Sequence, residues 1–254
     1  DAHNNLGIAL KELGQLDDSV KCYKKALDIN PDYAEVHNNL GVTLKELNQL
    51  DFAVKSFEKA VALKPDYTEA YLNLGNVLKT IGQFDAAIKS YEKALAINPD
   101  FTDTYNNLGI TYMNLGQQEK AIKYYEKALD INPDFANAHN NLGIVLNILD
   151  QQSAAKKSYK KAIAIKPDFA AAHLNLADLL TNLKQFDEAL VSYEYAIHLK
   201  PDADFALGSF LHTKMHLCIW NNLSVQLKEI IEKINSKKKI IEPFPLLALI
   251  DDPE

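Results

Sequence analysis

The chain has 254 residues, 47% of them hydrophobic, and a formal net charge of −7, which is typical of a folded, soluble protein. All 27 basic residues are lysines. Without arginine the planar fork that reads guanine and phosphate is missing, so composition and charge argue against nucleic-acid binding. The most apolar segment, residues 240–250, is interrupted by Glu242, Pro243 and Pro245, which makes it unsuited to crossing a membrane.

A pattern of 34 residues recurs six times over residues 1–203. With Ala34 as position 1 of a repeat, position 8 is small, position 24 is aromatic, position 27 is alanine and position 32 is proline. The position-8 residues are Gly7, Gly41, Gly75, Gly109, Gly143 and Ala177, and the position-24 residues are Tyr23, Phe57, Tyr91, Tyr125, Tyr159 and Tyr193. These residues resemble the tetratricopeptide repeat. The resemblance implies an all-α fold, a right-handed superhelical solenoid of antiparallel helix pairs.

The pattern predicts two helices in each repeat. The first is expected to end near position 15, where glycine adopts the left-handed conformation easily and asparagine tolerates it. The residues there are Gly14, Asn48, Gly82, Gly116, Asp150 and Lys184, of which the last two depart from the pattern. The second helix is expected to start at position 18 with a polar N-cap. These caps are Asp17, Asp51, Asp85, Ser153 and Asp187, with Glu119 as a weaker substitute.

The period breaks at Asp204. Residues 205–218 and 223–234 read as two further helices, so we expect residues 204–236 to form a capping helix pair. Residues 237–254 are expected to be a truncated linker toward a missing downstream domain. The chain also starts at Asp1 without methionine, inside a repeat, so we expect the natural protein to extend beyond both ends.

An asparagine occupies position 6 of every repeat: Asn5, Asn39, Asn73, Asn107, Asn141 and Asn175. At about 100° per residue, position 6 faces away from the partner helix and toward the concave groove of a stack. An asparagine amide can pair with both groups of a peptide backbone. We therefore expect these residues to bind extended polypeptide. The alternative is that they bridge adjacent repeats or bind ordered water.

Charge is expected to decide which polypeptide the groove prefers. Positions 2, 6, 9 and 13 share the groove face and contain seven acidic residues and no basic one. The acidic residues are Asp1, Glu12, Glu35, Glu46, Glu69, Asp103 and Asp178. A rim of Lys11, Lys45 and Lys79 lies beside them. We expect a basic partner, held more tightly at low salt.

Other polar residues predict structural roles. A second asparagine, at Asn4, Asn38, Asn106 and Asn140, is expected to be solvated or to contact the next repeat. The histidines His3, His37, His139 and His173 lie one or more repeats apart, too far to share a metal ion, so we expect packing residues. Cys22 and Cys218 are expected to be buried thiols in a reducing compartment, which suggests a cytoplasmic protein. We find no catalytic motif and expect no cofactor, no metal and no enzyme activity in this chain.

The tail carries a second resemblance. Trp220 with the helix after it, the segment Pro243-Phe244-Pro245-Leu246-Leu247 and the segment Asp251-Asp252-Pro253 are similar to the junction between repeats and catalytic region in bacterial relatives of the protein O-linked N-acetylglucosamine transferase and SPINDLY family. This resemblance implies an arm that presents Ser/Thr-containing segments to a glycosyltransferase. The alternative is a free-standing adaptor or chaperone-like scaffold. Homo-oligomerisation stays open.

Overall fold

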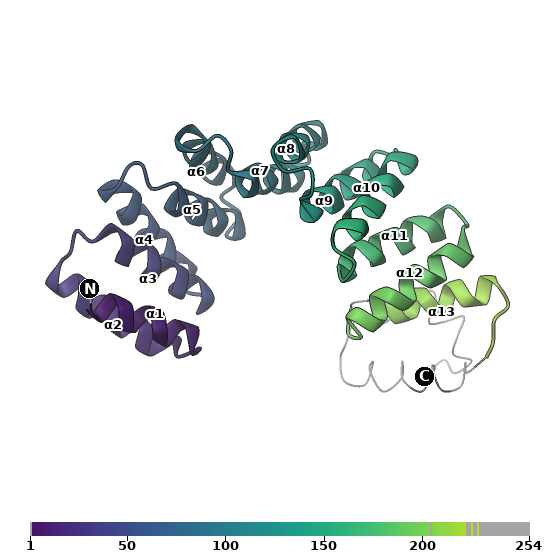
Figure 1. The fold of residues 1–254 in the computed structure, drawn as a ribbon, viewed down its shortest axis with the longest axis horizontal. Helices are drawn as coiled ribbons and strands as arrows, with labels where there is room; N and C mark the ends of the chain where they lie inside the picture. Colours follow the sequence, from purple (N-terminus) through teal and green to yellow (C-terminus); the bar gives the residue numbers. More distant parts are fainter. Residues whose placement is uncertain (1, 204, 222–224, 226–227, 229–254) are drawn as a thin grey trace. The chain divides into compact units, whose positions relative to one another are not determined.

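The computed structural model describes residues 2–203, 205–221, 225 and 228. In this part of the chain thirteen α-helices and no strand occur, which confirms the expected all-α repeat fold. The first twelve helices form antiparallel pairs, one pair for each repeat (Figure 1). The chain divides into two compact units, residues 1–132 and 133–254, and each is described by itself.

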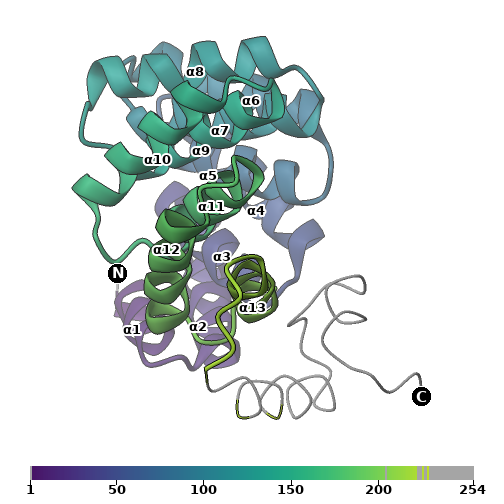
Figure 2. The same cartoon turned by 90° about the vertical axis from the view of Figure 1, so that its right-hand side faces the viewer.

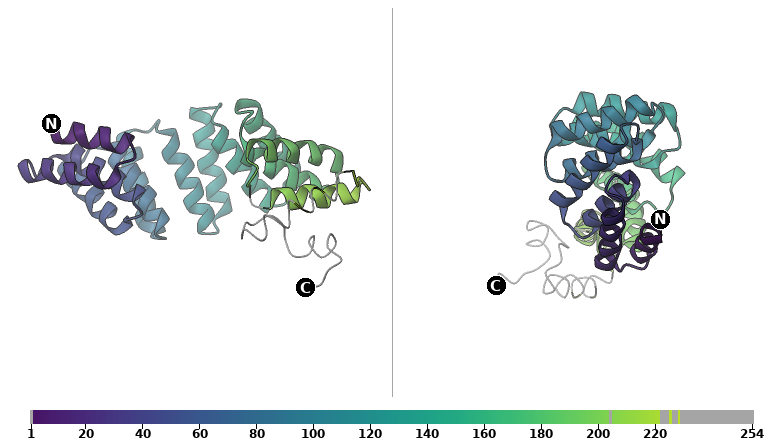
Figure 3. Two further views of the ribbon diagram at one scale, coloured as in Figure 1. Left: turned by 90° about the horizontal axis from the view of Figure 1, so that it is seen from below. Right: turned by 90° about the vertical axis from the view of Figure 1, so that its left-hand side faces the viewer.

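The first unit contains four helix pairs. Its helices are α1 Ala2–Glu12, α2 Leu16–Ile29, α3 Ala34–Glu46, α4 Leu50–Leu63, α5 Thr68–Thr80, α6 Phe84–Ile97, α7 Thr102–Asn114 and α8 Gln118–Ile131. Within this unit the second helix of each pair packs against the first helix of the next pair, as Figure 3 shows from another side. Since one pair cannot bury its apolar face alone, this stacking is what completes the core.

The second unit contains two further pairs and a single helix. Its helices are α9 Ala136–Ile148, α10 Gln152–Ile165, α11 Ala170–Asn182, α12 Phe186–Leu199 and α13 Ala206–His216. Helix α13 lies beside α12 (Figure 2) and falls within the helix expected over residues 205–218. The expected partner helix over residues 223–234 and the linker over residues 237–254 lie outside the described residues, apart from Val225 and Lys228.

The core of each repeat is built on the contact between positions 8 and 24. All six position-24 rings are at most 2% exposed. A Cβ placed on Gly41 would lie 2.7 Å from Cε1 of Phe57, and one on Gly109 would overlap Cε1 of Tyr125. Glycine at position 8 therefore lets the ring of the second helix lie directly on the backbone of the first. The aromatic series is core, as expected.

The structure confirms the expected left-handed turn inside each repeat and corrects the expected N-caps after it. Gly14 has φ +74°, while Asp150 and Lys184 both have φ +57°, so all three adopt the left-handed conformation. The expected N-caps at position 18 are wrong. Helix α2 begins at Leu16 after Gln15, and Ser19 N already donates to Gln15 O at 3.0 Å. Helical bonding starts directly after the left-handed turn, which places Asp17 inside the first helical turn, where the helix dipole favours its charge.

Candidate functional site

The position-6 asparagines of the first unit contact the repeat before them. Asn39 Nδ2 donates to Asn4 Oδ1 at 3.1 Å, and Asn73 Nδ2 donates to Asn38 Oδ1 at 3.1 Å. The acceptors are buried, with Asn4 8% and Asn38 2% exposed. Of the two roles expected for the position-5 asparagines, contact with the next repeat is correct for Asn4 and Asn38. The other role, exposure to solvent, is wrong for these two.

The fourth repeat departs from this arrangement because position 5 of the third repeat is Leu72. Asn107 therefore faces no asparagine in that register, and its Oδ1 accepts a hydrogen bond from Lys79 Nζ at 3.0 Å instead. In the second unit the pairing recurs, since Asn175 Nδ2 donates to Asn140 Oδ1 at 2.9 Å. Asn5 is exposed and Asn141 is half-buried.

The bridging alternative considered from the sequence therefore describes Asn39, Asn73 and Asn175. An asparagine amide carries two N–H donors and an oxygen with two lone pairs. A single donated bond uses one donor and fixes the plane of the amide. Each of these three half-buried side chains is thus held in one orientation, with hydrogen-bonding capacity beyond the inter-repeat bond.

The acidic side chains of the groove face differ in their partners. Glu35 pairs with Lys64 at 3.0 Å, and a hydrogen bond from Lys64 lowers the pKa of the Glu35 carboxyl. Glu46 pairs with Lys11 at 3.3 Å. The first unit also presents exposed carboxylates at Glu12, Glu69 and Asp103. In the second unit Asp178 Oδ1 accepts a 2.6 Å hydrogen bond from Tyr193 Oη. This carboxylate therefore provides an acceptor for the buried tyrosine of its own repeat.

Two of the position-12 lysines, Lys11 and Lys79, reach into the groove face, although the sequence places them only at its rim. Lys11 contacts Glu46, and Lys79 contacts Asn107. Burial, and secondly repulsion from Lys45, lower the pKa of the Lys79 ammonium. The signal that could have revealed this reach is the register itself, because a long side chain at position 12 lies close to positions 6 and 13 of the following repeat.

The position-4 histidines hold the turns between repeats. His37 Nε2 donates to the carbonyl oxygen of Pro31 at 2.8 Å, and His139 Nε2 does the same to Pro133 at 2.9 Å. His173 repeats the contact with Pro167 at 2.9 Å. The expected packing role is therefore correct for these three, and each ring also makes a hydrogen bond that the sequence pattern does not reveal.

The thiols are less buried than expected. Cys22 is half-buried and Cys218 is exposed, so the prediction of two buried thiols is wrong. The exposed position of Cys218 follows from its place in the turn after α13, where its φ is +56°. Among the described helices none has the length and apolar character needed to cross a membrane.

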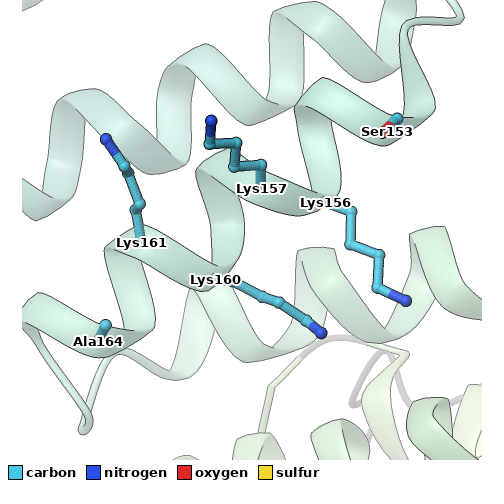
Figure 4. A pocket seen from close by; sticks show the side chains of 6 residues that line it. All are labelled: Ser153, Lys156, Lys157, Lys160, Lys161 and Ala164. Atoms are coloured by element: carbon cyan, nitrogen blue, oxygen red, sulfur yellow. The ribbon is translucent and has the colours of Figure 1, made fainter.

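Helix α10 carries a cluster of four lysines, Lys156, Lys157, Lys160 and Lys161, that line a shallow hollow. Figure 4 shows Lys156 and Lys160 pointing to one side of the helix and the other two pointing to the opposite side. Lys156 and Lys160 pair with Glu188 of α12 at 3.1 and 3.7 Å. This half of the cluster therefore ties the fifth repeat to the sixth.

Comparison with known families agrees with this architecture. Models of the tetratricopeptide repeat and TPR repeat match residues 7–47, 43–82, 79–116, 102–135, 124–157 and 151–206. The chain belongs to the tetratricopeptide repeat family. It is a helical-repeat scaffold for protein or peptide binding, and this fold is generally not catalytic. No curated protein matches the sequence significantly.

Solved structures give more specific similarities. The chain is 32% identical to a crystal structure of MamA, covering 63% of this chain and 94% of that one with a TM-score of 0.59. It is 25% identical to YrrB, described as a TPR protein with an unusual peptide-binding site, covering 76% and 97% with a TM-score of 0.56. PilF of Pseudomonas aeruginosa is 20% identical, covers 85% and 96% with a TM-score of 0.71, and shows the fold alone.

Proposed function

We propose that the first-helix face of each unit binds extended polypeptide through the position-6 asparagines. The observation that carries this proposal is the asparagine pairing, in which Asn39 and Asn73 are each held by a buried asparagine of the repeat before. A side chain already fixed in one rotamer loses little entropy when a ligand arrives. The similarity to YrrB, described as having a peptide-binding site, supports a peptide ligand.

The spacing of the repeats suits a backbone ligand. Neighbouring first helices pack about 10 Å apart, and an extended chain advances roughly 3.3–3.6 Å per residue. Within the first unit, one asparagine therefore meets about every third residue of a bound segment. An amide that pairs with backbone N–H and C=O groups accepts many sequences, so the asparagines supply affinity without sequence choice.

Sequence choice comes from the exposed carboxylates of the first unit, Glu12, Glu69 and Asp103. These favour lysine- or arginine-bearing segments, and the attraction weakens as salt screens it. Glu35 and Glu46 add less, because Lys64 and Lys11 already neutralise them.

The test uses Asn107→Ala, because Asn107 takes part in no asparagine pair of the first unit and its known partner is Lys79. A synthetic peptide of alternating Lys, Ser and Thr is titrated and followed by fluorescence anisotropy. Loss of one paired contact is expected to weaken binding by about 1 kcal/mol, roughly fivefold. Lys93→Ala, an exposed change on the second helix α6, is the control and should bind as the parent does. Equal affinity of all three proteins would contradict the proposal.

A finer role, the substrate arm of a protein glycosyltransferase, rests on the sequence of the tail. Trp220 is 51% exposed, and the Pro- and Asp-containing segments after it lie outside the described residues. Sequencing the reading frame past Glu254 tests this role. Several hundred codons that encode two lobes of alternating strands and helices would support it. A stop codon directly after Glu254 would remove it and leave a free-standing adaptor.

A further inference from the structure

A hollow of about 310 Å³ lies on the first unit between α2, α3 and α4, away from the position-6 asparagines. Its apolar lining comes from Leu27, Leu40, Leu44 and Phe52. It is also lined by His37, Gln49, Ser56 and three lysines, Lys24, Lys55 and Lys59. The hollow thus combines an apolar floor with several positive charges.

In the fourth repeat, an aromatic side chain occupies the location that corresponds to this hollow. There Tyr124 of α8 occupies position 23, and its ring stacks on Tyr112 at 5.2 Å and on Tyr105 at 6.4 Å between centroids. In the second repeat position 23 is Ser56, which is too short to extend over the floor. The chain therefore fills this location with an aromatic ring in one repeat and leaves it as a hollow in another.

The sixth repeat places a ring at this location by a different route. Tyr195 of α12, at position 26, stacks on the position-4 ring of His173 with 5.3 Å between centroids. In the second repeat the corresponding residues are Lys59 and His37. Two repeats thus cover their position-4 ring with an aromatic side chain from position 23 or position 26. The second repeat has Ser56 and Lys59 at these positions, and its Phe52 lines the hollow from position 19.

Lysines accompany the aromatic ring in the fourth repeat as well. Lys120 Nζ lies 5.2 Å from the Tyr112 ring centroid, and Lys127 Nζ lies 5.7 Å from that of Tyr105. Lys59 is the register equivalent of Lys127. An aromatic ring between lysine ammonium groups gains cation–π attraction in addition to its apolar contact.

The hollow has a lysine where the equivalent location of the fourth repeat has a glutamate. Glu92 of α6 lies near Tyr124, and burial, neighbouring tyrosines and this carboxylate raise the pKa of the Tyr124 hydroxyl to about 12. The register equivalent of Glu92 is Lys24. Asp32 lies 3.7 Å from Lys59 and is the paired acid at this site. The residues that line the hollow include three lysines and no acidic residue, which favours a ligand that brings its own carboxylates.

An aromatic ring fills the equivalent location of the fourth repeat, and lysines surround the hollow between α2, α3 and α4. We therefore propose that this hollow is a second binding site, and that it takes the aromatic side chain of an acidic peptide segment. The ring enters over Leu40 and Leu44 beside His37, as Tyr124 does beside Tyr105. The flanking Asp or Glu side chains of the segment contact Lys24, Lys55 and Lys59. This site prefers acidic peptides, whereas the asparagine face prefers basic ones.

The test is a titration of a fluorescein-labelled peptide with one Phe between pairs of Asp and Glu. Ser56→Tyr fills the hollow from inside, as Tyr124 does in the fourth repeat, and is expected to weaken binding at least about tenfold. The matched control is Ser90→Tyr, the same change at position 23 of the third repeat, which should leave affinity unchanged. Lys55→Glu combined with Lys59→Glu changes only exposed side chains and should weaken binding about tenfold at low salt.

Two further comparisons make the outcome decisive. The same peptide with Ala in place of Phe should bind at least about tenfold more weakly, since the ring supplies the apolar contact. Asn107→Ala should bind the Phe peptide as the parent does, because that residue belongs to the other face. Undiminished binding by Ser56→Tyr, or equal binding of the Phe and Ala peptides, would overturn the proposal.

Discussion

The side chain of Asn73 donates a hydrogen bond to Oδ1 of Asn38 in the preceding repeat, 3.1 Å away, and Asn38 is 2% exposed. A groove-facing side chain is thereby tied to a buried one. The same amide thus joins neighbouring repeats and, under the proposed function, also presents polar groups to a ligand. The two roles separate experimentally because Asn107 takes part in no such pair within the first unit.

Asn73→Ala is expected to lower the free energy of unfolding by about 1–3 kcal/mol, because the buried Asn38 oxygen loses its donor. Asn107→Ala is expected to cost less, because the Lys79 side chain that loses its acceptor is long and flexible, and because the better helix propensity of alanine offsets roughly 0.5 kcal/mol. Urea unfolding followed by circular dichroism measures both. Equal losses in the two variants would show that the asparagine pair contributes nothing particular to stability.

Lys184→Gly is expected to stabilise the second unit. Lys184 has φ +57° in the turn where the first, third and fourth repeats carry glycine. An L side chain in the left-handed conformation costs about 1–2 kcal/mol, so removing it should raise the free energy of unfolding by about 1 kcal/mol. Asn48→Gly, at the same turn with the same φ, is the control and should gain less, because asparagine tolerates this conformation. A destabilised Lys184→Gly protein would refute this reasoning.

Features that depend on residues close together in the sequence could be predicted, and contacts between different repeats could not. Helix pairs, buried position-24 rings and left-handed turns depend on local residue type and a strict period, so the sequence predicts them. The N-caps failed because Asp17 looked like a capping residue, while the helical hydrogen bonds begin at Gln15. The asparagine pairs, the reach of Lys79 and the hollow near Ser56 depend on side chains from different repeats. Their contacts require the spacing between helices, which no single repeat specifies.

Stability should fall in mild acid partly through His139. Burial lowers the pKa of this imidazole below its ordinary value of 6.5, and Lys161 lowers it further, against the opposing effects of the Pro133 carbonyl and Asp134. Below pH 6.5 the unfolded chain therefore binds more protons than the folded one at this site. The contribution is present above the ordinary pKa and is lost as pH falls toward the folded pKa.

The measurement is urea unfolding at about pH 8 and about pH 5 for the parent and for His139→Tyr, the residue type that Tyr71 and Tyr105 show at position 4. The tyrosine variant should lose less stability between the two pH values than the parent does. An identical loss in both proteins would mean that His139 does not contribute to the acid sensitivity.

Charge on the groove face should set peptide preference. Glu69→Gln combined with Asp103→Asn is expected to weaken binding of the Lys, Ser and Thr peptide several-fold at low salt, and by less at high salt, where screening already removes the attraction. Glu58→Gln with Glu92→Gln removes the same charge from the exposed surface of α4 and α6 and is the control. Equal effects of the two double variants would assign the preference to net charge instead of to the groove.

The side-chain amides of the position-6 asparagines report directly on whether polypeptide binds to them. In ¹⁵N–¹H correlation spectra, the side-chain NH₂ signals of Asn39, Asn73 and Asn107 are assigned by single substitution and followed as the Lys, Ser and Thr peptide is added. We predict that these signals shift together and saturate with the binding isotherm, while the turn amides of Asn30 and Asn98 stay in place. Saturable binding that leaves the three signals unmoved would contradict the claim that these asparagines hold the polypeptide.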